Sequence, residues 1–465
     1  MSAPSSVIVS RLDARNANGK ASSVLATGIQ GPRRCARSST ASVDAGPQSP
    51  VKTNAADWSL TDLLRSLELR AQYHLHHHVR DASMAYFLTS YTYATPFADY
   101  VPALFLSDPG AGDACRTAIS ATALAAYSRH IRSARHLEDA RRQYAKALIQ
   151  VNQLLARPET AVLDRTLGTV LVLGFFEAIV FEGGESPTSW TAHTLGSMQL
   201  LRLRGPPEAG NRLASHMYTH ASNNIKTSCI QRSVPIPEDF MAFDAQAAIT
   251  CPDVSTAWVK LSSLINKIAS IKARARNEAD VVLIQEALEL DEGIKALSES
   301  APDWMQYQDK HRSSPSSGTY RGVLHEYPNA RVAKIWNAIR LVRLFLIIFI
   351  YSATGEHCEA EKSRPDDEHQ VTRSRLGVYT RQNMDALTTE ILASVPAFME
   401  KDEAGTRFAP SGRSLVWPLG IIEETVLSRK CAKEYATKYL HELASDLNMP
   451  QVLHLSKQDI SINAW

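Results

Sequence analysis

Cysteine is scarce and scattered in this sequence. Only six of the 465 residues are cysteine, and no two of them are close enough to form a Cys-x-x-Cys pair. Disulfide-stabilised scaffolds and zinc ribbons depend on denser clusters, so this usage excludes a disulfide framework and indicates a reduced intracellular protein. The cysteines predict no metal site; they stand at Cys35, Cys115, Cys229, Cys251, Cys358 and Cys431.

Glycine and proline are also few, and neither sign of charge dominates. The chain has 21 Gly and 22 Pro, together about 9% of its residues against a usual share of about 12%. All-β proteins need frequent tight turns, so this composition argues against an all-β fold. The 50 Lys and Arg against 48 Asp and Glu leave a formal net charge of +2, which excludes a protein that neutralises nucleic-acid phosphate over its whole surface.

Long hydrophobic runs are missing as well. The longest, Leu344 to Tyr351, has eight residues, far below the roughly 20 that a membrane-spanning helix requires. It follows Arg340 and Arg343 directly. We therefore predict a buried helix at this position and no association with a membrane.

The first 56 residues differ in composition from the rest. This segment is rich in Ser, Ala, Gly and Pro, and it carries seven basic residues against two acidic ones. We predict that residues 1–56 form a disordered basic arm. Within it, Arg33, Arg34 and Arg37 could contact phosphate weakly and without regard to base sequence.

From residue 57 onward, hydrophobic residues recur at helical spacing. Within 136–156 apolar side chains repeat every three or four residues, and Pro158 is placed to end that helix and begin the next. Segment 160–182 is apolar on nearly all sides, which is typical of a central buried helix. Gly205, followed by two prolines, marks the end of a helix over 189–204. Further helices are predicted near 59–70, 76–93, 113–132, 254–272, 275–298, 324–351, 376–394, 412–430 and 431–446.

These patterns predict an all-α protein, built as a large multi-helix bundle or an irregular helical array. No run of residues alternates convincingly between polar and apolar as a strand would. Two polar stretches, 298–322 and 352–375, are interpreted as surface loops within one helical domain that covers 57–465.

Known catalytic and metal-binding motifs fail in detail. His441 and Glu442 begin a zincin-like helix, but Ser445 stands where the second histidine is needed. The acidic run from Asp366 to Glu368 lacks the acid that a diphosphate-binding magnesium motif requires, because Gln370 stands there. Neither motif predicts a metal or cofactor, and neither does a histidine cluster without nearby acids at His74, His76, His77 and His78.

Two buried polar residues are the remaining candidates for a site. Glu177 lies in the most apolar segment, and His193 lies in the helix that follows it. A carboxylate in such surroundings must be paired, since burying it alone is costly. The two residues are interpreted either as a structural pair inside the core or as part of a ligand pocket.

Several short segments, taken in order, resemble a known fungal domain. The first are 118–128, 140–148, 164–167 with 176–177, 189–196 and 200–205. The later ones are 333–340, 393–398 and 416–419. Together they are similar to the all-α regulatory domain that follows the zinc cluster in fungal binuclear-zinc-cluster (C6) transcription factors. The resemblance covers about 58–465.

The zinc cluster itself does not appear in this sequence. In that family it uses six cysteines, the first three spaced Cys-x2-Cys-x6-Cys. Here only Cys35 precedes the helical domain. The resemblance therefore implies DNA contact that is indirect or lost, unless an upstream exon encodes the module.

The resemblance implies a nuclear, non-enzymatic regulator of transcription. Such regulators govern pathway genes, including secondary-metabolite clusters, and act with other transcription factors, co-regulators or a second copy of themselves. Two alternatives remain open from the residues alone. One is an all-α enzyme or small-molecule-binding protein of a biosynthetic pathway, and the other is a helical scaffold.

Overall fold

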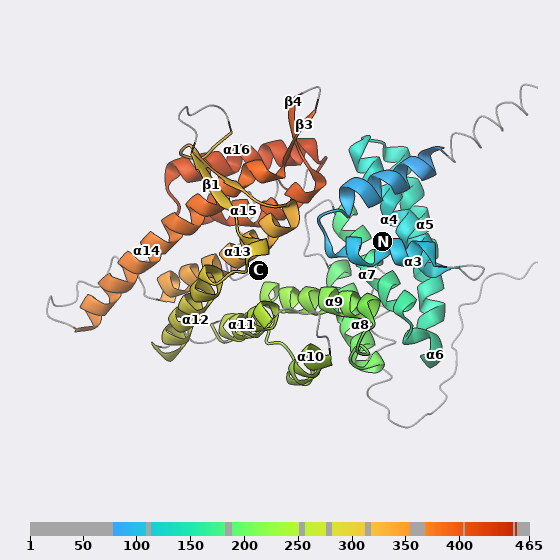
Figure 1. Ribbon diagram of the computed structural model, residues 1–465, viewed down its shortest axis with the longest axis horizontal. Coiled ribbons are helices and arrows are strands. Elements are labelled where there is room, and N and C mark those ends of the chain that lie inside the picture. The colour runs from blue at the N-terminus through green and yellow to red at the C-terminus, as the bar shows by residue number, and fades with distance from the viewer. Residues whose placement is uncertain are drawn as a thin grey trace, which may run out of the picture.

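Helices make up nearly all of the chain that the structure describes. The computed structural model describes residues 78–107, 113–181, 188–250, 256–275, 281–311, 318–353, 368–402, 405–449 and 452. A helical segment over 78–86 continues into the π-helical turn η1 (Phe87–Tyr91). The predicted all-α class is confirmed (Figure 1).

The helices of the first half follow one another with short connections. They are η2 (Pro96–Asp99), α3 (Val101–Leu106), α4 (Ala114–His130), α5 (Ala134–Leu155), α6 (Pro158–Ala161), α7 (Asp164–Val180), α8 (Thr188–Arg204), α9 (Arg212–Gln231) and α10 (Glu238–Thr250). The second half contains α11 (Thr256–Arg274), α12 (Val281–Glu299), η3 (Asp303–Met305), α13 (Ala330–Ala353), α14 (Glu368–Ser394), η4 (Val395–Phe398), η5 (Pro410–Leu415), α15 (Val416–Glu424) and α16 (Lys430–Asp446).

Small side chains hold the N-terminal helices close together. The alanines of α4, among them Ala118, Ala121 and Ala125, are completely buried where α5 and α7 pack against that helix. Small residues let helix backbones approach closely and gain dispersion contacts along their length. This group forms the centre of a first hydrophobic core, which we define by its buried side chains between Phe87 and Ile350.

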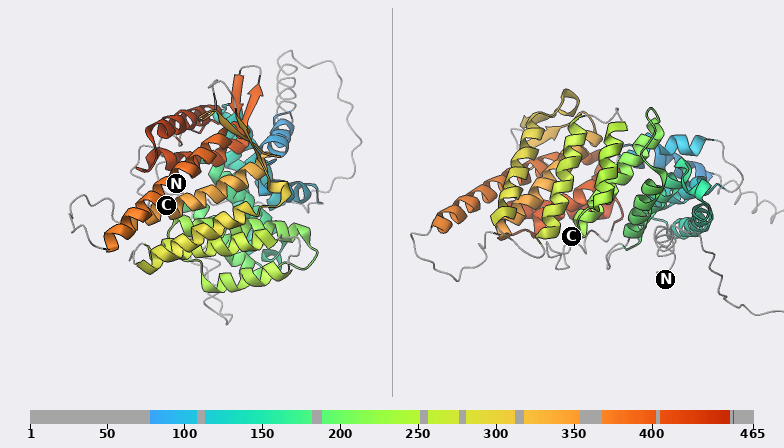
Figure 2. Two further views of the ribbon diagram at one scale, coloured as in Figure 1. Left: turned by 60° about the vertical axis from the view of Figure 1, so that its left-hand side comes forward. Right: turned by 90° about the horizontal axis from the view of Figure 1, so that it is seen from below.

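A second hydrophobic core joins α13, α14, α15 and α16. Its buried side chains lie between Tyr320 and Val452. The apolar run predicted as a buried helix lies in α13, which contributes Trp336 and Ile339 to the first core and Leu344 and Ile347 to the second. The first half of the chain and the C-terminal helices lie on opposite sides of the molecule, and α14 projects beyond its neighbours (Figure 2).

A buried ion pair connects α12, α13 and α14. The guanidinium of Arg343 donates from Nε and Nη2 to the two carboxylate oxygens of Asp291, at 2.8 and 3.0 Å. The hydroxyl of Tyr379 donates to the same carboxylate at 2.8 Å. Asp291 is fully buried. One carboxylate therefore holds three helices together at a position without solvent.

Four short strands lie among the helices of the described chain. Antiparallel hairpins join β1 (Gln308–His311) to β2 (Val323–Glu326), and β3 (Met399–Asp402) to β4 (Gly405–Phe408). Each strand has four residues, which is too short for an alternating pattern to stand out. The first hairpin also shows that the polar stretch 298–322 is not only a loop, because it contains η3 and β1.

Several helix boundaries differ from the predicted ones. The helix expected over 324–351 starts at Ala330, where the side chain of Asn329 caps it by accepting from the backbone N–H of Val332 at 3.0 Å. The segment expected to form one helix over 412–430 is divided between η5 and α15. The polar stretch 352–375 ends in the first turns of α14.

Other predictions are confirmed or lie outside the described residues. Pro158 opens α6, and Gly205 follows α8 with a positive φ of 78°. The helices α9 and α10 were not predicted. The arm 1–56 and the helix over 59–70 lie outside the described residues, and the domain range 57–465 stays a prediction. In the part of the chain that the structure describes, no helix is both long and apolar enough to cross a membrane.

We expect Asp291→Ala to lower the free energy of unfolding by about 3–5 kcal/mol, because it leaves Arg343 buried without a counter-charge. Urea denaturation followed by circular dichroism measures the change. The matched control is Glu326→Ala, which removes a half-exposed partner of Lys310 and should cost less than about 1 kcal/mol. Equal losses in the two variants would contradict a structural role for the buried pair.

Candidate functional site

A tyrosine links the two polar residues singled out from the sequence. Glu177 lies on α7 and His193 on α8, and the hydroxyl of Tyr144 on α5 hydrogen-bonds to both. The two helices approach closely because Gly174 has no side chain, since a Cβ there would lie 3.3 Å from the Cβ of His193. Three helices therefore meet at one small polar cluster inside an apolar region.

The hydrogen bonds of this cluster are donated in sequence from His193 to Tyr144 and from Tyr144 to Glu177. The Tyr144 hydroxyl donates to Oε1 of Glu177, and with its proton used in that bond its oxygen accepts from Nε2–H of His193, 3.2 Å away. This arrangement leaves the Nδ1 atom of His193 without a proton. Among the described residues, that buried atom has no hydrogen-bond partner.

Burial controls the charge of both titratable groups. It lowers the pKa of His193 to about 4, so the imidazole is neutral at neutral pH. Burial raises the pKa of Glu177, and the hydrogen bond from Tyr144 partly offsets that rise. The cluster is thus a chain of hydrogen bonds around a neutral histidine rather than an ion pair.

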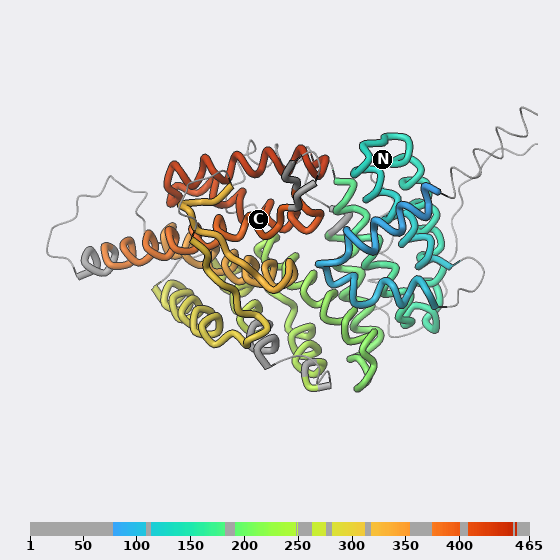
Figure 3. Tube along the Cα trace, turned by 45° about the horizontal axis from the view of Figure 1, so that its top comes forward, coloured from blue at the N-terminus to red at the C-terminus, as the bar shows by residue number. Residues whose placement is uncertain are grey.

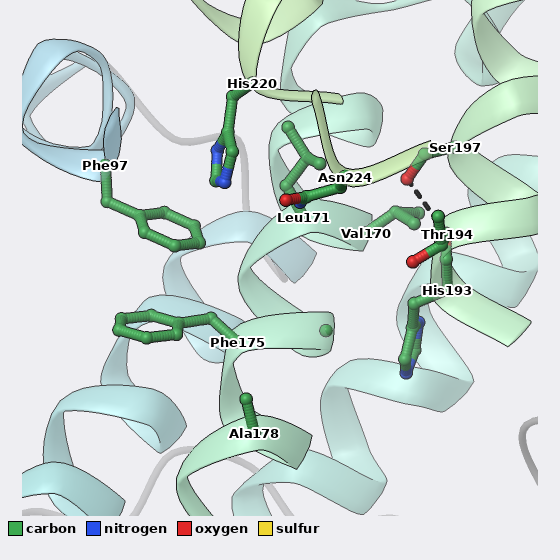
Figure 4. A pocket seen from close by; sticks show the side chains of 11 residues that line it. Phe97, Val170, Leu171, Phe175, Ala178, His193, Thr194, Ser197, His220 and Asn224 are labelled. Atoms are coloured by element: carbon green, nitrogen blue, oxygen red, sulfur yellow. Dashed lines mark hydrogen bonds between the residues drawn. The ribbon is translucent and has the colours of Figure 1, made fainter. Parts of the chain in front are cut away.

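His193 also lines a cavity of about 100 Å³ between α7, α8 and α9. Its ring and that of His220 lie on different sides of this space, and the rings of Phe97 and Phe175 lie on a third (Figure 4). The two phenylalanine rings stack with centroids 4.3 Å apart. Burial lowers the pKa of His220 to about 4 as well, with a smaller opposing effect of Asp99.

The cavity is polar in places but carries no charge from its histidines. Its volume has room for a few water molecules and is below the roughly 300 Å³ at which pockets for small-molecule ligands begin. Ser197, which also lines the cavity, donates from its hydroxyl to the carbonyl oxygen of His193 at 2.9 Å. It is therefore not paired with the imidazole as a nucleophile with its base would be.

The other sequence motifs contribute no site in the described chain. His441 is exposed on α16, and Glu368 is the first residue of α14. No group of three or more His, Cys, Asp or Glu among the described residues could hold a metal ion. The predicted phosphate contacts and most of the histidine cluster lie outside the described residues; these are Arg33, Arg34, Arg37, His74, His76 and His77.

Sequence reasoning did not identify Tyr144. It fits the apolar face of α5 and was counted only as one of the residues that define that face. A signal was present, because a buried tyrosine hydroxyl normally finds a hydrogen-bond partner. The partner itself could not be read from the sequence, since 33 residues separate Tyr144 from Glu177.

We expect His193 to make the protein less stable as the pH falls. The unfolded chain binds a proton near pH 6.5 and the folded chain only near pH 4, so acidification across this window favours unfolding by up to about 3 kcal/mol. His193→Gln keeps a donor for Tyr144 but does not titrate. Urea denaturation between pH 4.5 and 7 should show a weaker pH dependence for this variant.

The control for this experiment is His441→Gln, which alters an exposed histidine. Its unfolding free energy should depend on pH as that of the unsubstituted protein does. An unchanged pH dependence in His193→Gln would show that the buried imidazole is not responsible.

Two curated relatives come from Emericella nidulans. An uncharacterized protein, AN5342, is 31% identical over 96 residues, which is 21% of this chain and 20% of that protein. The transcription factor dbaG is 22% identical over 346 residues, 67% of this chain and 76% of the relative. The chain thus covers only about a fifth of the first relative. No solved structure matches.

A family model settles the classification. The model described as "Fungal specific transcription factor domain" matches residues 73–422, a range that includes the buried polar cluster, its cavity and α13. The chain belongs to the fungal specific transcription factor domain family.

Proposed function

We propose that the protein regulates transcription in the fungal nucleus and controls pathway genes, such as those of a secondary-metabolite cluster. The observation that carries this proposal is the family match over residues 73–422. The alignment with a named transcription factor over 67% of the chain supports it. Pathway and compartment are proposed from the family resemblance and not from any one residue.

In this proposal the helical domain controls activity, and DNA is contacted through a partner. Among the described cysteines, Cys115 and Cys229 are buried on α4 and α9, while Cys431 is exposed on α16. These three cannot share a metal ion. The partner would be another transcription factor with its own DNA-binding module, a co-regulator or a second copy of this chain.

The proposed role is not enzymatic. A hydrolytic site needs a nucleophile held by its base, and Ser197 instead bonds to a backbone carbonyl. The alternative of a small-molecule-binding protein is supported by a specific observation. A second pocket, described in the next subsection, is lined by Lys334 and Arg413. Binding of a small molecule is compatible with a role in regulation. A scaffold without either role would leave transcript levels unchanged.

Chromatin profiling with a tagged chain, combined with transcript sequencing of a deletion strain, tests the proposal. We expect the protein to be enriched at the promoters of a defined gene set, and the same genes to change expression several-fold on deletion. Restoring the unsubstituted chain should restore the transcripts. Exclusion from the nucleus together with unchanged transcripts would contradict the proposal.

A second variant separates direct from indirect DNA contact. Replacing Arg33, Arg34 and Arg37 together with alanine removes the cations proposed for weak phosphate contact. If a partner provides DNA contact, promoter occupancy should stay within about twofold of that of the unsubstituted protein, because exposed cations give only weak, salt-sensitive affinity. Loss of occupancy would instead show that the arm is the main DNA contact.

A further inference from the structure

A second and larger pocket lies where the first half of the chain meets the C-terminal helices. Its volume is about 360 Å³, within the range of small-molecule sites. One wall comes from η1 and α7, and the other comes from α13, η5, α15 and the residues after α16. In Figure 3 these C-terminal elements, orange to red, lie beside the N-terminal group, blue to cyan. The lining is largely apolar and aromatic, with Tyr91, Phe175, Phe181, Val416 and Met449.

Two cations line this pocket. Lys334 projects from α13 and donates from Nζ to the carbonyl oxygen of Ala94 at 3.0 Å. Arg413, on η5, donates to the hydroxyl of Tyr91 and, at 2.7 Å, to the carbonyl oxygen of Ala178. All three partners are uncharged. The Ala178 carbonyl lies in the last turn of α7. The carbonyls at this end of a helix carry only a partial negative charge, so they stabilise a cation less than a carboxylate does.

Neither cation has a carboxylate partner among the described residues. Asp99, on η2, is held by Arg331 of α13, whose two nitrogens donate to both carboxylate oxygens at 2.9 and 2.7 Å. Arg340 and Arg343, on the same helix as Lys334, are each paired with an acid. Lys334 therefore differs from these two arginines of its own helix, and Arg413 on η5 likewise has no acidic partner among the described residues.

This arrangement is electrostatically unfavourable without an anion. Burial and, to a smaller extent, the neighbouring charge of Arg413 together lower the pKa of Lys334 to about 8. Two like charges next to apolar walls repel each other, and a bound anion would relieve both the repulsion and the lost hydration. The amino group of Lys334 and the guanidinium of Arg413 also keep hydrogen-bond donors that their three protein partners do not use.

We propose that this pocket binds a small organic acid, with its carboxylate between Lys334 and Arg413 and its apolar or aromatic body against Phe175 and Val416. The apolar lining disfavours a phosphate or a strongly hydrated anion, which would lose hydration to walls that cannot replace it. The guanidinium of Arg413 lies 5.6 Å from the ring centroid of Tyr91 and 6.0 Å from that of Phe175, so the cation and the aromatic surface of the pocket adjoin. Arginine and lysine together supply the charge-assisted hydrogen bonds that hold a carboxylate.

A bound acid would connect the two hydrophobic cores. Its carboxylate would contact α13 and η5, and its body would rest against α7. Phe175 and Ala178 line both this pocket and the smaller cavity beside His193. Binding of the acid would thus change the contacts between the two halves of the molecule. This inference concerns ligand binding and does not depend on the proposed role in transcription.

Fluorescence titration with two matched probes tests the proposal. Anilinonaphthalene sulfonate carries an anionic group on an aromatic body, and phenylnaphthylamine has the same body without the charge. We expect the sulfonate to bind the full chain at least tenfold more tightly than the neutral probe, as two charge-assisted contacts predict. Naphthoate, the carboxylate form, should displace the sulfonate, and inorganic phosphate at the same concentration should not.

Substitutions then locate the binding site. Lys334→Met should weaken sulfonate binding at least tenfold and leave the neutral probe unaffected. Arg413→Met should act in the same direction. The matched control is Arg331→Met, one turn earlier on α13, because Arg331 is half exposed and does not line the pocket. Circular dichroism confirms that each variant folds.

Lys334→Met decides the result if Arg413→Met unfolds, since Arg413 also holds the end of α7. Equal sulfonate affinity in Lys334→Met and Arg331→Met would overturn the proposal. Equal affinity of the two probes, or displacement by phosphate as effective as that by naphthoate, would overturn it as well. None of these measurements involves transcription, so their failure is distinct from failure of the proposed function.

Discussion

The rest of the structure depends on the burial of α13 on nearly every side, although this helix carries cations. Its apolar residues contribute to both hydrophobic cores, so the helix has no face that could be turned entirely toward water. Arg343 is neutralised by Asp291, and Arg340 by Glu390 within a ring of aromatic side chains that includes Tyr307 and Trp336. Partners for these charges must come from α12 and α14, which fixes how the second half packs.

Lys334, unlike the arginines of this helix, is not paired with a carboxylate, and it lies at the junction of the two cores. Structural cations in the interior are satisfied by the fold itself, whereas this one faces a pocket that contains a second positive charge. A regulatory domain needs a place where a signal can alter the contact between its parts. The pocket is suited to that role because its walls come from both halves, while the smaller histidine cavity is enclosed within one of them.

Much of the fold could be predicted from local sequence patterns, because helix periodicity and its Pro and Gly signals act over a few residues. Pro158 and Gly205 mark real helix boundaries for that reason. The hairpins could not be predicted, since four-residue strands carry too little pattern. Glu177 and His193 could be singled out as polar residues in helices expected to be buried; His193 is buried and Glu177 half-buried, and their link through Tyr144 depends on tertiary packing. Lys334 and Arg413 showed no signal, because a pair 79 positions apart becomes a feature only after folding.

The hydrogen bond between Arg413 and Tyr91 spans 322 positions of the chain. During synthesis at about 5–20 residues per second, the N-terminal wall of the larger pocket would wait roughly 15–60 s for the opposite wall. Throughout that interval the last turn of α7 lacks the guanidinium that contacts Ala178, and its apolar surface is uncovered. Folding of this region is therefore governed by the arrival of the end of the chain, and chaperone protection during translation matters most for the surface that η5 and α15 finally cover.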